Sequence, residues 1–242
     1  MAVKLTVVGC SPAWPNPGGA QSGYLVEGPG KLLLDCGPGV LARLREKDAW
    51  PIVDAIVISH FHLDHWGDLV PWVWGRMFGL GTEQDPPALW LPPDGRVELQ
   101  AFGERFGTAD MFERTFTVSE YAEDEPFSAA GLQVTAVRLP HYRLRTFGVR
   151  VSNADRTLAY SGDSGPSERL AELARDVDLF LCEATLEHGV TDGEPRGHLS
   201  VDEAVSSFRA SGARRLLLTH RPAELPLADG IEQARDGLIL EV

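Results

Sequence analysis

Residues 59–65 (Ser-His-Phe-His-Leu-Asp-His) constrain the fold most strongly, because they carry three histidines and an aspartate within six positions. The segment directly follows the apolar run at 55–58, which predicts a buried strand. Alternate residues of an extended chain point to the same side, so His60 and His62 can bind one ion. Asp64 and His65, beyond a bend, would then face a neighbouring ion. The segment predicts a two-metal site at the end of a strand.

Further candidate ligands also lie next to apolar runs. The full set is His60, His62, Asp64, His65, His141, Asp163 and His220. Imidazole and carboxylate without thiolate suit Zn²⁺, Mn²⁺ or Fe²⁺, and two such ions roughly 3.5–4 Å apart need a shared carboxylate, for which we choose Asp163. We expect His60, His62 and His141 on one ion and Asp64, His65 and His220 on the other.

The remaining pattern is that of one α/β domain spanning residues 1–242. Apolar strand-like runs at 3–8, 24–27, 31–35, 55–58, 132–137, 147–151, 157–160, 178–182 and 215–219 alternate with stretches of helical spacing. Ser200 and Glu203 have the spacing of a capping box, which predicts a helix start, and Gly212 is a candidate stop. Polar residues collect at strand ends, the usual position of sites in α/β proteins.

Two stretches are harder to interpret. Residues 66–80 carry more large apolar side chains than one helix can bury, so they form either a thick core helix or, as alternatives, a dimer face or a pocket wall. Residues 85–131 are rich in proline and then acidic, and we interpret them as an insertion over the sheet edge.

The net charge of −13 bears on the partners. An acidic surface without a basic patch repels a polyphosphate backbone, so large nucleic acids are disfavoured while small anions attracted by metal ions are not. The three widely spaced cysteines are expected to be small buried side chains, not a disulfide framework. The N-terminus resembles no signal peptide and no apolar run reaches membrane-spanning length, so we expect a cytoplasmic protein without membrane contact.

The order of these residues resembles the metallo-β-lactamase superfamily. His60-x-His62-x-Asp64-His65 is similar to its metal motif, and Asp35, His141, Asp163 and His220 fall in the order of its other motif positions. The resemblance implies an αββα sandwich with a dinuclear site at one sheet edge. Asp35 follows an apolar strand, and two interpretations stay open: a carboxylate that caps a turn, or one that supports a ligand histidine.

Two further residues distinguish branches of the superfamily. Glu183 in Cys-Glu-Ala-Thr and His198 in Gly-His-Leu-Ser resemble the carboxylate and histidine motifs of the RNase Z-like phosphodiesterase branch. The resemblance implies that Glu183 orients His198, which protonates the leaving oxygen. We therefore count Asp64, Glu183 and His198 as catalytic residues.

Within that branch we expect hydrolysis of a small phosphodiester, a cyclic nucleotide such as 3′,5′-cAMP or a related cyclic phosphate. The alternatives are a tRNA 3′-processing nuclease, a thioester or lactone hydrolase of the same fold, and a non-catalytic protein. The tRNA-processing enzymes typically carry a long arm between the positions of His141 and Asp163, where only 21 residues lie here. A homodimer is a further expectation.

Overall fold

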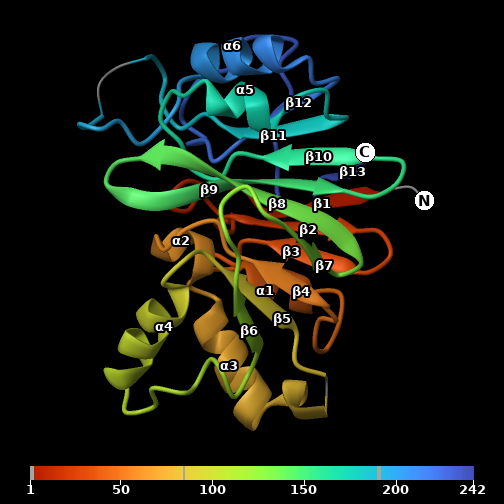
Figure 1. The fold of residues 1–242 in the computed structure, drawn as a ribbon, viewed down its shortest axis with the longest axis vertical. Coiled ribbons are helices and arrows are strands. Elements are labelled where there is room, and N and C mark those ends of the chain that lie inside the picture. Colours follow the sequence, from red (N-terminus) through yellow and green to blue (C-terminus); the bar gives the residue numbers. More distant parts are fainter. Residues whose placement is uncertain (1–2, 84, 190–191) are drawn as a thin grey trace.

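The computed structural model describes residues 3–83, 85–189 and 192–242. Its two β-sheets pack face to face, and helices cover both outer faces (Figure 1). The first sheet has the order β13-β1-β2-β3-β4-β5-β6, and the second has the order β12-β11-β10-β9-β8-β7. The αββα sandwich predicted from the sequence is confirmed.

The strands of the first sheet are β1 (Lys4–Gly9), β2 (Gly23–Glu27), β3 (Lys31–Leu34), β4 (Ala55–Val57), β5 (Ala88–Leu91), β6 (Thr117–Glu120) and β13 (Ile239–Glu241). Those of the second are β7 (Pro126–Ala129), β8 (Leu132–His141), β9 (Leu144–Ser152), β10 (Thr157–Tyr160), β11 (Leu179–Glu183) and β12 (Leu216–Thr219). The first sheet is covered by α1 (Val40–Arg45), α2 (Leu63–Trp66), α3 (Leu69–Phe78), η1 (Leu80–Glu83) and α4 (Gly95–Glu104). The second is covered by α5 (Arg169–Leu173) and α6 (Val201–Ser211).

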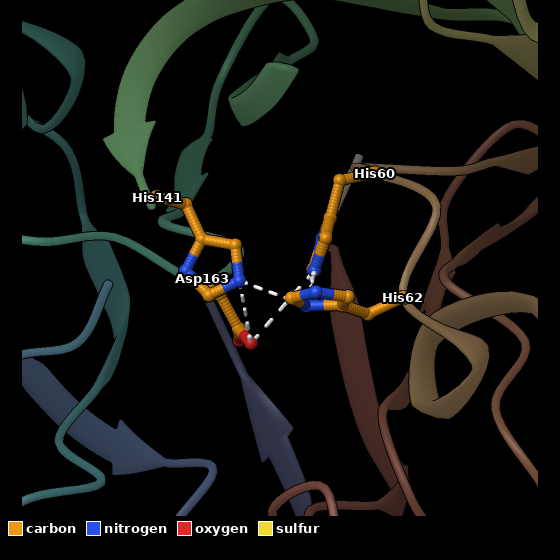
Figure 2. Close-up of side chains that lie close together, drawn as sticks. All are labelled: His60, His62, His141 and Asp163. Atoms are coloured by element: carbon orange, nitrogen blue, oxygen red, sulfur yellow. Dashed lines mark hydrogen bonds and ion pairs between the residues drawn. The ribbon is translucent and has the colours of Figure 1, made fainter. Parts of the chain in front are cut away.

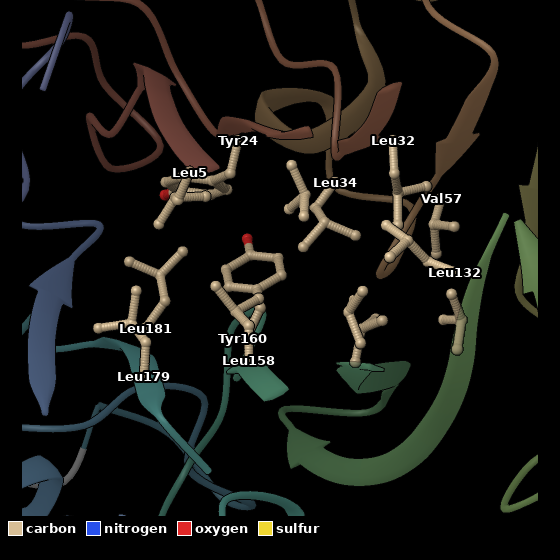
Figure 3. Close-up of a cluster of buried hydrophobic side chains, with 14 of the residues drawn as sticks. Leu5, Tyr24, Leu32, Leu34, Val57, Leu132, Leu158, Tyr160, Leu179 and Leu181 are labelled. Atoms are coloured by element: carbon tan, nitrogen blue, oxygen red, sulfur yellow. The ribbon is translucent and has the colours of Figure 1, made fainter. Parts of the chain in front are cut away.

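The core between the sheets is formed by strands that carry apolar side chains on both faces. In β3, Leu32 and Leu34 join the cluster between the sheets while Leu33 faces the helices. In β11, Leu179 and Leu181 point inward in the same way (Figure 3). Continuous apolar runs of this kind are typical of strands buried on both faces, so the predicted strands pack without a polar side.

Parallel pairing brings the candidate site residues to one edge. β3 and β4 are parallel neighbours in the first sheet, and β10, β11 and β12 are parallel in the second. Each of these strands is followed, or ended, by at least one candidate site residue. The carboxyl ends of parallel neighbours lie at the same edge, so each sheet gathers its own polar groups there.

The interpretation of residues 85–131 as an insertion is wrong. Both β5 and β6 pair in parallel with the first sheet and extend it beyond β4, and β7 is the outer strand of the second sheet. The strands were missed because each has four residues, β5 lies between prolines, and β6 has only one apolar residue, so neither length nor alternation distinguishes them from loops.

Most of the aromatic stretch at residues 66–80 forms the single helix α3. On α3, Leu69, Trp72 and Val73 are buried against the first sheet, as expected of a core helix. Trp74 and Phe78, four residues apart on another face, are 38% and 76% exposed and stack on each other. The stretch is therefore core on one face only.

The predicted cap of α6 is present. The Ser200 side chain accepts a hydrogen bond from the Glu203 backbone, the Glu203 carboxylate accepts one from the Ser200 backbone, and Gly212 ends the helix with φ 71°. All three cysteines are buried, as expected. None of the described helices combines the length and apolar character that crossing a membrane requires.

Candidate metal centre

The seven predicted ligands come from both sheets and meet at one edge. His60 and His62 lie in the loop after β4, and Asp64 and His65 lie on the short helix α2. From the second sheet, His141 ends β8, Asp163 follows β10, and His220 follows β12. These side chains form two groups that share Asp163 and whose donor atoms all lie within 4.8 Å of one another inside each group.

The first group contains three imidazoles around one oxygen (Figure 2). His62 Nδ1 is 3.2 Å from His60 Nε2 and 2.9 Å from His141 Nε2. Asp163 Oδ2 lies 3.8 Å from His60 Nε2 and 3.9 Å from His141 Nε2. The spacing is that of ligands around a common centre.

The second group contains two imidazoles and two carboxylates. Asp64 Oδ2 lies 3.3 Å from His65 Nε2 and 3.1 Å from His220 Nε2. The other oxygen of Asp163, Oδ1, is 3.3 Å from His65 Nε2 and 3.5 Å from His220 Nε2. Each oxygen of Asp163 thus faces a different group, as expected of a bridging carboxylate.

The hydrogen bonds around the groups fit a metal ligand set. His65 Nδ1 donates to Asp35 Oδ2 at 2.7 Å and His141 Nδ1 donates to the Gly197 carbonyl at 2.6 Å, which leaves each Nε2 lone pair directed into the site. Among the described residues, His65 Nε2 and Asp163 Oδ1 are buried without a hydrogen-bond partner. A divalent cation would satisfy both atoms, so the residues fit the ions that the motif implies.

The charge states of His60, His62 and Asp163 agree with this donor set, whereas His65 differs: burial opposes its protonation, but Asp163, Asp35 and Asp64 raise its pKa well above the usual value. Burial lowers the pKa of His60 well below its usual value, and the neighbouring imidazoles add to the effect. Burial and His141 lower the pKa of His62 to about 4. Burial opposes ionisation of Asp163, but His220 and His65 hold its pKa well below the usual range. Metal ions bind neutral imidazoles and ionised carboxylates, so His65 has to lose its proton when an ion binds.

Asp35 supports a candidate ligand and does not merely cap a turn. It lies directly after β3 with φ 58°, and its oxygens accept hydrogen bonds from His65 Nδ1, the Ser59 backbone and the Tyr160 hydroxyl, each at 2.7 Å. The side chain is fully buried. These contacts fix the His65 ring, so of the two interpretations left open the structure favours support of a ligand histidine.

Two supporting residues were not predicted from the sequence. Tyr160, which holds Asp35, looks like an ordinary apolar residue of a strand. Thr185 Oγ1 lies 2.8 Å from His220 Nδ1 and 3.0 Å from Glu183 Oε2, so it connects a candidate ligand to a candidate catalytic residue. The only sequence signal for Thr185 is its hydroxyl, placed two residues after Glu183 at the end of a strand.

Glu183 and His198 lie together beside the two groups. His198 Nδ1 donates to Glu183 Oε1 at 2.9 Å and is 4.0 Å from Asp163 Oδ2. The other oxygen of Glu183, Oε2, accepts hydrogen bonds from Thr185 and from the Leu199 backbone. The carboxylate therefore holds the imidazole in one orientation.

The His198 imidazole stays protonated near neutral pH. Burial lowers its pKa, but Glu183, Asp163 and Asp192 outweigh burial and raise it to about 9. Its ring stacks on that of His220 at 5.6 Å between centroids, and its side chain is 13% exposed. A protonated, partly accessible imidazole beside a metal site can donate a proton to a bound substrate.

The comparisons with known proteins agree with this geometry. The family model described as a beta-lactamase superfamily domain matches residues 31–221. The chain is 36% identical over 240 residues to the uncharacterized protein Rv1339 of Mycobacterium tuberculosis, with 97% of this chain and 86% of that protein covered.

Two further relatives carry functional names. The probable metallo-hydrolase YhfI of Bacillus subtilis is 31% identical over 223 residues, covering 91% of this chain and 87% of that protein. Its crystal structure matches with a TM-score of 0.82, 25% identity and complete coverage of both chains. Ribonuclease Z of Myxococcus xanthus is 26% identical over 275 residues, covering 90% of this chain and 86% of that protein.

Proposed function

The chain belongs to the beta-lactamase superfamily as a metallo-hydrolase of that fold, and from this premise we propose that it hydrolyses a small phosphodiester of the cyclic-nucleotide class. The observation that carries the proposal is the Glu183–His198 contact beside the two ligand groups. A carboxylic ester or thioester hydrolase of this fold needs no such pair, whereas a phosphodiesterase must protonate an alkoxide leaving group. One relative bears the name of a ribonuclease, an activity on phosphodiesters.

We propose two divalent ions, with Zn²⁺ as the first choice and Mn²⁺ or Fe²⁺ as alternatives. His60, His62 and His141 would hold one ion, Asp64, His65 and His220 the other, and Asp163 both. When bound, such ions supply positive charge to the phosphoryl oxygens and make a water molecule more acidic.

The protein's own contribution to the reaction is proton delivery. His198 donates its proton to the leaving oxygen as the P–O bond breaks, which prevents the formation of a high-energy alkoxide. Glu183 keeps the imidazole in place and compensates its positive charge before transfer. The buried hydrogen bonds on Glu183 keep this carboxylate fixed during the reaction.

The preference for a small substrate rests on the segment between His141 and Asp163. Its 21 residues are taken up by the turn at Tyr142, by β9 and by β10, which pair within the second sheet. No residues of this segment remain to form a protruding arm. The net charge of −13 likewise disfavours a polyanionic substrate.

A turnover screen tests the proposal. The Zn²⁺-loaded and Mn²⁺-loaded proteins would be assayed with bis-p-nitrophenyl phosphate, cyclic nucleotides, a thioester and a lactone. We expect turnover of the phosphodiesters and little of the other two. No phosphodiester cleavage with either loaded metal would refute the proposal.

His198→Ala gives the sharper test of mechanism. Because a ribose oxygen needs protonation to leave, kcat for a cyclic nucleotide should fall about 10²–10⁴-fold. The p-nitrophenolate group leaves as a stable anion, so bis-p-nitrophenyl phosphate should lose much less. Steady-state kinetics on both substrates, with metal content measured in parallel, make the comparison.

His188→Ala is the matched control, because this imidazole is 76% exposed and belongs to neither ligand group. It should keep wild-type kinetics. Equal losses for both substrates in His198→Ala at unchanged metal content would contradict the role of proton donor.

A further inference from the structure

Tyr142 has an unusual backbone conformation next to the site. It is the first of two residues in the turn that joins β8 to β9, since His141 pairs with Leu144 across the hairpin. Its φ of 46° lies in the left-handed region, which glycine or asparagine normally occupies in such a turn. A tyrosine persists there only if its surroundings compensate the strain, so its contacts require an explanation.

Those contacts converge on the segment that carries His198. The Tyr142 hydroxyl donates to Asp192 Oδ2 at 3.1 Å, and its ring centroid is 5.6 Å from that of His198. The same ring packs on Gly197 so closely that a Cβ there would lie 2.3 Å from its carbon atoms. The residue before His198 therefore has to be glycine as long as Tyr142 keeps this position.

Asp192 connects the tyrosine hydroxyl to the backbone of His198. Its Oδ2 accepts hydrogen bonds from the His198 amide at 3.0 Å and from the Gly197 amide at 3.2 Å. Tyr142 donates to the same oxygen. The hydroxyl and Arg196, whose Nε lies 3.6 Å from Asp192 Oδ1, hold the carboxylate from two sides. The carboxylate in turn fixes the two peptide groups that place the imidazole.

On the carbonyl side of His198, Arg196 connects the segment to Glu203 of α6. Its Nη2 donates to the His198 carbonyl at 3.2 Å, and its guanidinium forms two hydrogen bonds to Glu203, at 2.7 and 3.0 Å. Glu203 is itself fixed by the helix cap at Ser200. Because α6 already restrains the carbonyl side of His198, Tyr142 and Asp192 supply the restraint on the amide side.

We infer that Tyr142 is a positioning residue that sets the place of the His198 imidazole through Asp192 and Gly197. The inference rests on the proposed function, in which His198 donates a proton to the leaving oxygen. Proton transfer demands hydrogen-bond distance in the transition state, and a small displacement of the donor is costly. Glu183 fixes the orientation of the ring, whereas Tyr142 fixes where the ring stands.

The variant Tyr142→Phe tests the inference because it keeps the ring on Gly197 and removes the hydrogen bond to Asp192. We expect kcat for a cyclic nucleotide to fall about tenfold at unchanged KM, while turnover of bis-p-nitrophenyl phosphate stays within about twofold of wild type. Metal content and thermal midpoint should match wild type. A residue that merely fills space would change neither substrate selectively.

Thr157→Val is the matched control. It removes another hydroxyl-to-carboxylate hydrogen bond, from Thr157 Oγ1 to Asp178 Oδ2 at 3.2 Å, at the opposite end of β10 from Asp163. Its kinetics on both substrates should be those of wild type. A selective loss of cyclic-nucleotide turnover in this control would show that the effect is not specific to Tyr142 and would overturn the inference.

A readout independent of activity completes the test. In protein labelled with ¹⁵N-histidine, Tyr142→Phe should shift or broaden the His198 imidazole signals and leave those of His60 unchanged. Unchanged His198 signals, or equal rate losses on both substrates, would overturn the inference. If the wild-type protein cleaves no phosphodiester, the proposed function fails while the His198 signals still decide whether Tyr142 positions the ring.

Discussion

Asp163 is the residue on which both ligand groups depend. Its side chain is fully buried, and each of its oxygens faces a different pair of imidazoles. Burying a carboxylate without compensation is costly, and here His220 and His65 supply the compensating charge. Replacing this side chain therefore affects both groups at once, unlike the loss of any single histidine.

We predict that Asp163→Ala abolishes turnover and lowers the content of at least one metal ion per chain. The reason is that both groups lose an anionic ligand and the link between them. Elemental analysis of the dialysed protein, with kinetics in parallel, measures both effects.

Asp229→Ala, which removes an exposed carboxylate, should keep full metal content and activity. Two ions per chain together with normal turnover in Asp163→Ala would sink the bridging assignment.

At the scale of single residues, the sequence predicted the site residues whose chemistry is unusual, such as clustered histidines. It did not predict residues whose role depends only on where the fold places them. Histidines clustered after an apolar strand are unusual enough to indicate a site. Tyr160 is not, because its partner Asp35 lies 125 positions away and only the packing of the two sheets brings them together. The role of Tyr142 depends on a dihedral angle and on Asp192, which no local pattern encodes.

Helix α6 is the element that connects the fold to the proposed proton donor. Its capping box joins Ser200 to Glu203, and Glu203 also binds Arg196, which holds the His198 carbonyl. The start of the helix thus restrains the preceding loop. A weaker helix start should matter for stability more than for metal binding.

We predict that Ser200→Ala lowers the free energy of unfolding by about 1 kcal/mol, because the backbone amide of Glu203 loses its hydrogen-bond acceptor. Chemical denaturation of the metal-loaded protein measures the change. Metal content should not fall.

The comparison variant is Ser206→Ala, an exposed position within the same helix. It should be neutral or slightly stabilising, since alanine is the better helix former. Equal destabilisation by the two substitutions would mean that the cap contributes nothing of its own.

Helices and strands could be predicted from the sequence where the local pattern of apolar or capping residues is strong. Long apolar runs such as β11 and the capping box of α6 were found. β8 ends at His141, as expected, and runs through Pro140, whose missing N–H is tolerated in this strand. β5 and β6 are short, and the pairing of β5 with β4 and of β6 with β5 stabilises them more than their own sequences do.

For the whole molecule, the net charge and the chain topology both favour a small substrate over a large polyanion. The chain has a net charge of −13, and the segment between His141 and Asp163 is used up by sheet pairing. A large polyanion would meet repulsion without an arm to hold it. A small phosphodiester is exposed to the local charge of the site more than to the net charge of the surface.

We predict that a precursor tRNA is neither bound nor processed at about 50 mM salt, where electrostatic attraction to nucleic acids is strongest. Gel-shift and 3′-trailer cleavage assays measure this, with cyclic-nucleotide turnover by the same preparation as the activity control. Accurate removal of the trailer would contradict the proposed substrate class and favour the nuclease alternative.

The position of the site at the seam between the two sheets has a consequence for folding. Its candidate ligands come from α2 and the loop after β4 on one side and from β8, β10 and β12 on the other, so a chain with separated layers cannot assemble the full set. Ions that bind only the assembled state stabilise it by mass action. The number of ions bound per chain in a preparation would then measure the fraction of chains in which the two sheets are packed as in the native fold.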